Sequence, residues 1–198
     1  MSDEDKFSLE DGTLLIKFAR ENIEYFLLNN RRIPVPLEMK SKFGDKYGAF
    51  VTLNKTNIRG NPLRGCIGYI EPSYPLYDVV HKVSISSAIE DPRFPSVTIE
   101  EMDNIVIEIS ILTPPRLLEV DNPEDCLNKI VIGRDGVLLR KRGYSAVYLP
   151  QVAPEQGWNR DEMLMHLCAK AGLDADCWKQ DVELYIFQAE VFSEEEMK

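Results

Sequence analysis

The segment NIVIEISILTPP, residues 104–115, restricts the possible folds of this chain more than any other. Isoleucine occupies every second position from Ile105 to Ile111, and alternate side chains of a strand point to the same face. Val106 and Leu112 make the opposite face partly apolar as well. The segment therefore predicts a central strand, apolar on both faces, in a mainly antiparallel sheet.

Three other segments carry apolar residues at helical spacing. Ser8 is a predicted N-cap before an amphipathic helix that covers 14–27. Pro75 suits the first turn of a helix over 76–89, which the DPRFP segment would end. Asn159 followed by Glu162 predicts a capping box at the start of a third helix, 160–171, and Gly172 its C-cap.

The remaining segments predict strands and their connections. AFVTLN, residues 49–54, and NPLRGCIGYI, residues 61–70, predict the two arms of a hairpin. Residues 129–150 predict two or three strands with turns at Asp135-Gly136 and Gly143. The segment 182–192 predicts a late strand that returns to the sheet, whereas 31–48, with two prolines and two glycines, predicts an extended connector.

Strands and helices alternate without regular βαβ units, so the fold class is predicted to be α+β, with a mainly antiparallel sheet flanked by helices. We expect a single domain over residues 8–194, with a smaller lobe around 115–160 and a lobe boundary near Pro114-Pro115. The last strand would cross back from that lobe.

Composition and charge exclude several functional classes. The formal net charge is −10, which disfavours a nucleic acid held by charge alone. The first ten residues lack a secretory signal, and no apolar run is long enough to span a bilayer, so we expect a cytoplasmic protein with no membrane partner.

The four cysteines form no CxxC pair or other short pattern, which predicts neither a zinc site nor a disulfide framework. His81 and His166 lie on separate predicted helices without a second histidine at i+3 or i+4. We therefore expect no metal and no cofactor. The motifs of serine nucleophiles, phosphate loops and dinucleotide sites do not occur in the sequence.

The LRGCIG segment is the first candidate site. Arg64 and Cys66 share a strand face, so the guanidinium could favour the thiolate or hold an anionic ligand group. Gly65 and Gly68 would allow a ligand or another backbone to approach closely. Cys66 is then either a nucleophile or a small buried apolar residue, and both alternatives stay open.

Two further segments carry candidate ligand-binding residues. DPRFP is either a rigid helix stop or a loop that presents Arg93 to an anion. In APEQGW, Glu155 and Gln156 precede Trp158, which is either a core anchor or a ligand platform. Glu155 could pair with Arg64 or act as a general base.

The segments LRGCIGYIEPSYPLYD, DPRFPSV, EISILTPP and YLPQVAPEQGW, in this order and spacing, resemble the AMMECR family over nearly the whole chain. The resemblance implies an α+β domain with a larger and a smaller lobe, and with LRGCIG near the cleft between them. It assigns no reaction. In prokaryotes the domain is associated with Memo-like proteins and a radical S-adenosylmethionine protein, which implies a cytoplasmic modification pathway.

Two functional hypotheses follow. In the first, which we favour, the protein is an accessory module that binds a protein partner or a small anionic ligand. The alternative is an enzyme that acts on a small or nucleotide-like anionic substrate through Cys66, Arg64 and Glu155. Both hypotheses expect LRGCIG, DPRFP and LPQVAPEQGW to converge on one concave surface, with Arg64 as its main charged group.

Overall fold

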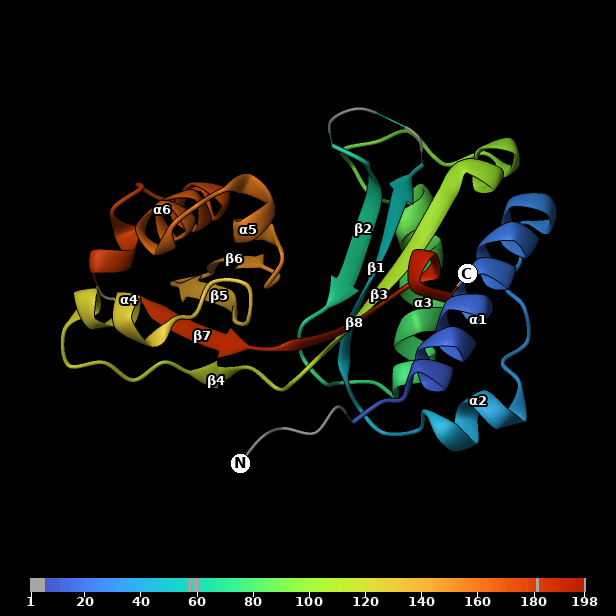
Figure 1. Ribbon diagram of the computed structural model, residues 1–198, viewed down its shortest axis with the longest axis horizontal. Coiled ribbons are helices and arrows are strands. Elements are labelled where there is room, and N and C mark those ends of the chain that lie inside the picture. Colours follow the sequence, from blue (N-terminus) through green and yellow to red (C-terminus); the bar gives the residue numbers. More distant parts are fainter. Residues whose placement is uncertain (1–5, 57, 59–60, 181, 198) are drawn as a thin grey trace. The chain divides into compact units, whose positions relative to one another are not determined.

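The computed structural model describes residues 6–56, 58, 61–180 and 182–197, which form two compact units (Figure 1). Unit 1 contains the described residues up to Leu112 and those from Glu190 onward, and unit 2 is Thr113–Ala189. The second unit begins close to the predicted boundary but does not end near residue 160. It extends further because strand β7, Glu183–Phe187, pairs with β5, Gly136–Lys141.

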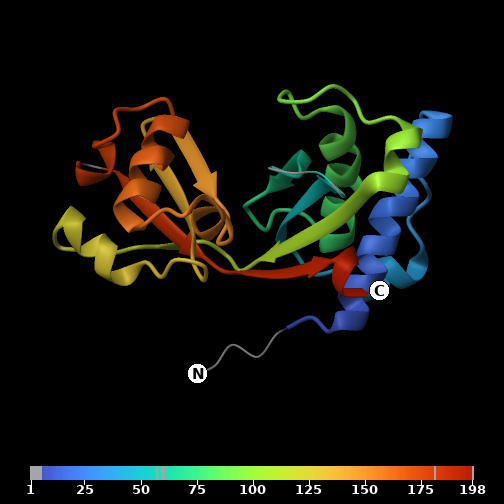
Figure 2. The ribbon, with the colours of Figure 1, turned by 45° about the horizontal axis from the view of Figure 1, so that its top comes forward.

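Unit 1 is built on a four-stranded sheet in the order β2-β1-β3-β8. Its strands are β1 Gly48–Lys55, β2 Leu63–Tyr69, β3 Ile105–Leu112 and β8 Ala189–Ser193. Its helices are α1 Leu9–Asn29, α2 Leu37–Lys42, α3 Leu76–Ile89 and the short 3-10 helices η1 Ile99–Asn104 and η4 Glu194–Met197. Figure 2 shows α1 and α3 along the same face of this sheet.

The core of unit 1 confirms the role predicted for residues 105–112. Strand β3 lies between β1 and β8, and its four isoleucines are buried against α1 and α3. Strands β1 and β2 form the predicted antiparallel hairpin, and β1 also pairs antiparallel with β3. Period-two alternation was a sufficient signal here because one face of this strand is fully covered.

The three predicted helices form, and two of them begin at the predicted caps. Ser8 and Asp11 make a reciprocal capping box at the start of α1, which is longer at both ends than the predicted segment 14–27. Asn159 and Glu162 make the same arrangement at α6, Arg160–Lys170. Both boxes satisfy backbone N–H groups within one turn of chain, so local sequence is enough to specify them.

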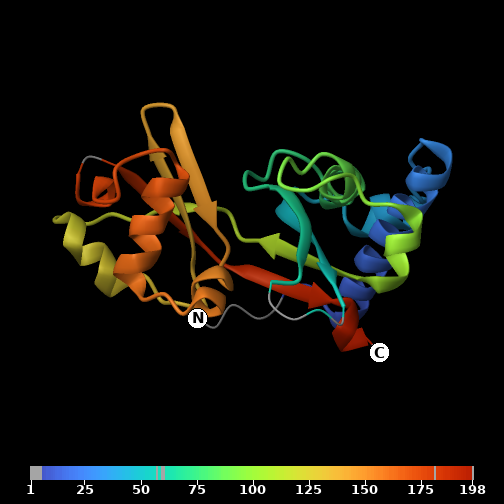
Figure 3. The ribbon, with the colours of Figure 1, turned by 90° about the horizontal axis from the view of Figure 1, so that it is seen from above.

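Unit 2 is built on a second four-stranded sheet, in the order β4-β7-β5-β6. Its elements are β4 Arg116–Leu117, η2 Pro123–Asp125, α4 Cys126–Lys129, β5, β6 Tyr144–Tyr148, α5 Val152–Gln156, α6, η3 Cys177–Lys179 and β7. Figure 3 shows the β5–β6 hairpin beside α6. Its separate apolar core includes Leu164, Leu167 and Trp178.

Three sequence predictions are corrected by these elements. The single strand predicted over 182–192 is two strands, β7 in the sheet of unit 2 and β8 in the sheet of unit 1. The extended connector contains helix α2, which begins after Pro36. Residues 129–150 hold two strands, within the predicted two or three, but the first turn lies at 132–134 and not at Asp135-Gly136.

A fourth correction concerns the cysteines. Cys168 in α6 and Cys177 in η3 form a disulfide, although nine positions separate them in the sequence. Spacing alone gave no sign of this pair, because the two residues meet only when the segment after α6 folds back on that helix. Cys66 and Cys126 remain free thiols.

Candidate functional site

Strand β2 is an edge strand, and α3 covers only one of its two faces. A Cβ atom at Gly65 would collide with the backbone carbonyl of Ser87 in α3. Ile67, on the same face as Gly65, packs against the core of unit 1. Cys66 alternates with these residues and therefore points to the opposite face, whereas Arg64 lies where the register of the hairpin shifts, opposite Leu53 and Asn54.

On that opposite face, three polar residues of neighbouring strands form a row. Cys66 pairs with Thr52 of β1, and Thr52 pairs with Glu108 of β3. The Thr52 hydroxyl donates a hydrogen bond to Cys66 Sγ at 3.2 Å. We call Cys66, Thr52 and Glu108 the Cys66 row, since residues directly opposite one another in a sheet are side-chain neighbours.

The surroundings of Cys66 do not activate its thiol. Burial raises the pKa of Cys66, and the nearby Asp91 and Glu108 carboxylates act in the same direction. The hydrogen bond from Thr52 and the charge of Arg93 oppose this change without overcoming it. Because the thiolate is the nucleophilic form, this arrangement favours the apolar alternative for Cys66 over the nucleophilic one.

We expect Cys66 in the folded protein to react with iodoacetamide at pH 7 at least about tenfold more slowly than in urea-unfolded protein. The raised pKa leaves little thiolate, and the half-buried sulfur is poorly accessible. Mass spectrometry of the Cys66 peptide over time measures the rate, and the buried Cys126 is an internal control for a protected thiol. Faster labelling of Cys66 in the folded state would contradict the expectation and support the enzymatic alternative.

Asp91, at the end of α3, connects the site to the DPRFP segment. Its carboxylate accepts hydrogen bonds from Cys66 N at 2.9 Å and from Arg93 Nε at 2.9 Å and Nη2 at 2.6 Å. The Arg93 guanidinium and these backbone bonds lower the pKa of Asp91 to about 2, against the effect of burial. The buried Asp91 is therefore ionised at neutral pH, and its hydrogen bonds hold both strand β2 and the Arg93 side chain in position.

Arg93 is the exposed cation of this arrangement. Its side chain is 52% exposed, and Nη2 also lies 3.4 Å from the Cys66 carbonyl oxygen. Within the described part of the chain, Nη1 of Arg93 has no hydrogen-bond partner. Asp91 thus holds the Nε and Nη2 edge of the guanidinium in place beside the Cys66 row. The edge that carries Nη1 is available to a ligand.

Arg64 lies elsewhere than the sequence hypothesis placed it. Its side chain is 6% exposed and forms a two-bond ion pair with Glu101 of η1, Nε to Oε1 at 3.0 Å and Nη2 to Oε2 at 2.9 Å. Nη1 donates to the Pro95 carbonyl at 2.8 Å. The partner of Arg64 is therefore Glu101 and not Glu155, and the exposed positive group of unit 1 near Cys66 is Arg93.

Gly65 and Gly68 serve close packing. A side chain at Gly68 would meet the Ala49 carbonyl oxygen and the Phe50 ring of β1, as one at Gly65 would meet α3. Of the two alternatives for these glycines, a ligand or another backbone, the structure shows backbone atoms against both, and their role in ligand binding stays a prediction. Ser87 completes the contact, because its hydroxyl accepts from Ile67 N at 3.0 Å and lies 2.7 Å from the Val51 carbonyl oxygen, to which it can donate.

The APEQGW residues belong to unit 2. Glu155 and Gln156 are exposed on α5, and partial burial raises the pKa of Glu155. The half-buried Trp158 ring stacks on His166 at 4.1 Å between ring centroids and packs against the core of its unit. Each unit carries its own candidate residues, and the convergence of the three segments on one surface stays a prediction.

The histidines are engaged in packing. His81 Nε2 donates to the Ile33 carbonyl at 2.9 Å, and its ring stacks on Phe18. No cluster of three or more His, Cys, Asp or Glu side chains suited to a metal ion occurs among the residues that the structure describes. Over the same residues, no helix has the length and apolar character needed to cross a membrane.

Sequence reasoning missed Asp91, Thr52 and Glu108. Asp91 had a local signal, because an aspartate two residues before an arginine at a helix end can pair with it. Glu108 interrupts an apolar strand, which is a further signal for a polar face. Thr52 could be found only from the register of the hairpin, since its role depends on lying opposite Cys66.

Comparisons with known proteins agree with this description. The pattern of the family described as AMMECR1 matches residues 16–192. Protein PH0010 of Pyrococcus horikoshii is 46% identical over 193 residues, covering 96% of this chain and 93% of that protein. Protein MJ0810 of Methanocaldococcus jannaschii is 45% identical over 191 residues, which cover 96% of this chain and 92% of that protein.

The fold has a solved counterpart. The crystal structure of the uncharacterised protein PH0010 superposes with a TM-score of 0.89 at 46% identity, over 93% of this chain and 91% of that chain. The α+β architecture, with its antiparallel sheets and flanking helices, is therefore shared. The sequence pattern, the relatives and the fold together show that this chain belongs to the AMMECR1 family.

Proposed function

We propose that this protein is a binding module that captures an anionic group through Arg93 beside the Cys66 row. The open edge of the Arg93 guanidinium carries this proposal. A planar guanidinium suits a carboxylate or phosphate, and Asp91 holds it in one orientation so that little side-chain entropy is lost on binding. The bound group would belong to a small ligand or to a partner protein.

The surroundings of Arg93 set it apart from a similar ion pair in the same chain. Arg134 is also 52% exposed and paired to a buried aspartate, Asp135, by two hydrogen bonds. That pair belongs to unit 2, whereas Arg93 and the Cys66 row belong to unit 1. Arg134 therefore provides a matched control for Arg93.

The enzymatic alternative has less support. It requires a reactive thiolate at Cys66, whereas burial raises the pKa of that thiol. It also assigns Arg64 to the substrate, whereas the donors of Arg64 are occupied by Glu101 and Pro95. A binding role needs neither group to react.

Family resemblance suggests the setting. We infer that the module acts in the cytoplasm, in a modification pathway with Memo-like and radical S-adenosylmethionine proteins. If so, quantitative capture from native lysate should recover such partners with wild type and lose them with Arg93→Ala, while Arg134→Ala retains them. Equal recovery by all three proteins would contradict a role for Arg93 in this association.

Binding of the anionic group can be tested with defined probes. We expect inorganic phosphate or acetate to shift the Cys66 amide and Arg93 Nε–H signals in ¹⁵N-labelled protein, and we expect Arg93→Ala to weaken phosphate binding about tenfold or more. Arg93→Lys should recover part of the loss, because it restores the charge without the planar fork.

Two outcomes would contradict the proposal. The first is an absence of shifts in wild type up to high millimolar probe. The second is an equal loss of binding in Arg134→Ala, which would indicate a general effect of net charge rather than a site at Arg93.

A further inference from the structure

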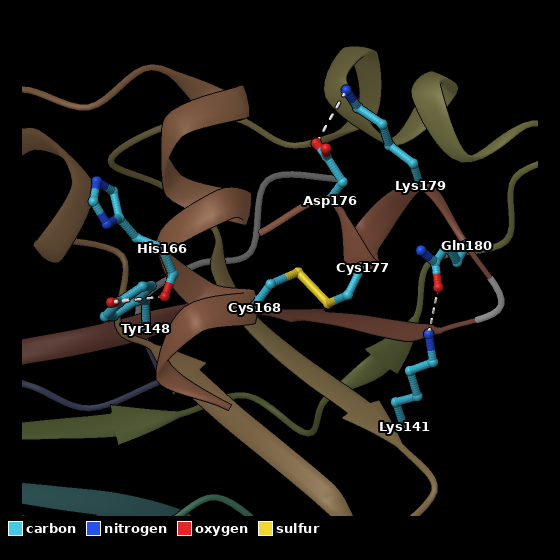
Figure 4. The surroundings of a disulfide bond; sticks show 8 residues. All are labelled: Lys141, Tyr148, His166, Cys168, Asp176, Cys177, Lys179 and Gln180. Carbon is cyan, nitrogen blue, oxygen red and sulfur yellow. Dashed lines mark hydrogen bonds and ion pairs between the residues drawn. A yellow bond between two sulfur atoms is a disulfide. The ribbon is translucent and has the colours of Figure 1, made fainter. Parts of the chain in front are cut away.

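The disulfide between Cys168 and Cys177 fastens an irregular segment of unit 2 to helix α6 (Figure 4). Cys168 lies in α6, and Cys177 begins η3, which has only three residues. Both cysteines are buried, with 0% and 2% of their surface exposed. The bond therefore lies inside the core of unit 2 and closes the loop that leads from α6 towards β7.

The fastened segment contributes a large side chain to the core of unit 2. Trp178, next to Cys177, is 1% exposed and is among the largest fully buried side chains of the protein. Within the described residues its indole nitrogen has no hydrogen-bond partner. Apolar burial and the neighbouring disulfide are thus what position the ring.

Among the residues that the structure describes, few other hydrogen bonds hold this segment. The backbone hydrogen bonds of residues 177–180 are local, such as Cys177 N to Asp174 O at 2.9 Å and Gln180 N to Cys177 O at 3.1 Å. One exposed hydrogen bond connects this segment to strand β5, from Lys141 Nζ to Gln180 Oε1 at 3.0 Å (Figure 4). Without the disulfide, only the burial of Trp178 and these bonds would hold the segment against α6, so the segment would open more readily.

We propose that Cys168 and Cys177 form a thiol–disulfide switch that sets the stability of unit 2 independently of unit 1. A small disulfide such as oxidised glutathione is the oxidant. One cysteine thiolate attacks it, releasing one glutathione thiolate and forming a mixed disulfide. The second cysteine thiolate then displaces the second glutathione, so two protein thiols lose two electrons and two protons while one glutathione disulfide becomes two thiols.

The location of the tryptophans makes the switch measurable in the intact chain. Trp158 and Trp178 are the two tryptophans of the sequence, and both lie in unit 2. Indole fluorescence therefore reports on unit 2, and hydrogen exchange of peptides within residues 105–112 reports on the core of unit 1. The two readouts separate a local effect from global unfolding.

The test equilibrates the full chain in glutathione buffers from fully oxidised to fully reduced and unfolds it with urea. We expect reduction to raise the opening equilibrium constant of unit 2 about 100-fold, the effect of releasing a loop of about ten residues. Hydrogen exchange in 105–112 should stay within about twofold. A 2 Da mass difference would confirm that one disulfide is reduced.

Variants connect the effect to this pair of thiols. Cys168→Ala/Cys177→Ala should show the reduced behaviour in every buffer, and Cys66→Ala should keep the full redox dependence. The proposal is overturned if the oxidised protein has four free thiols, if reduction leaves unit 2 unchanged, or if both units loosen equally. These results are independent of anion binding at Arg93.

Discussion

Replacing Glu101 with leucine is expected to lower the free energy of unfolding by about 2 to 3 kcal/mol, less than the loss for a fully buried ion pair because the Glu101 side chain is 27% exposed. Arg64 is 6% exposed, and after the change only the Pro95 carbonyl would accept from it. Urea unfolding followed by circular dichroism measures the loss. The exposed neighbour Glu100 supplies the matched control, because Glu100→Leu should leave the free energy of unfolding close to that of wild type.

A double variant separates the ion pair from other roles of Glu101, which also accepts from Thr98 N and pairs with Lys55. Arg64→Met/Glu101→Leu should be clearly more stable than Glu101→Leu, since it no longer buries an unpaired charge. The expectation is contradicted if the double variant loses as much free energy of unfolding as the two single variants together. In that case the ion pair is not what stabilises the contact between η1 and β2.

The same ion pair predicts part of the acid sensitivity. The Arg64 guanidinium lowers the pKa of Glu101 to about 2 in the folded protein, whereas an unperturbed glutamate has a pKa of about 4.3. A depressed folded pKa stabilises the protein above the unfolded value, and this contribution is lost as the pH falls from about 4 to 2. Glu101→Gln should therefore show a shallower loss of stability than wild type in this window.

Replacing Gly65 with alanine should destabilise unit 1 by about 2 to 3 kcal/mol and displace the Cys66 row. The added methyl group would collide with the backbone carbonyl of Ser87, and a helix backbone cannot move aside as a flexible side chain can. Strand β2 would have to separate from α3, which also weakens the hydrogen bond from Ile67 N to Ser87 Oγ. Urea unfolding and the Cys66 amide shift measure the two effects.

The adjacent Cys66→Ala variant is the control for this prediction. It removes one sulfur atom from the same strand without adding an atom near α3. It should therefore lower the free energy of unfolding by about 1 kcal/mol and leave the fold of β2 unchanged. Gly65→Ala with wild-type stability would show that β2 and α3 can separate without loss, contrary to the packing of this hairpin.

Local features of this chain were predictable from its sequence because they depend on contacts within one or two turns. The capping boxes at Ser8 and Asn159 satisfy the first N–H groups of their own helices, and the isoleucines of β3 define a buried face by period alone. The AMMECR resemblance rests on the same kind of local information, namely short segments in a given order. Fold class and the hairpin of LRGCIG followed from these signals.

Tertiary structure decided everything that depends on register or on long loops. The sequence pattern of residues 182–192 predicts one strand. In the structure the segment divides between two sheets, because β7 pairs with β5 in unit 2 and β8 pairs with β3 in unit 1. Cys168 and Cys177 meet only after the chain turns back on α6.

The composition of the candidate site was decided in the same way. Arg64 pairs with a glutamate 37 positions away in η1, and Thr52 lies opposite Cys66 by hairpin register. The motifs indicate candidate segments, but ion pairs and rows across strands form between segments that lie far apart in the sequence. Which arginine is buried and which is exposed depends on those long-range partners: Glu101 buries Arg64, whereas Asp91 holds Arg93 at the surface.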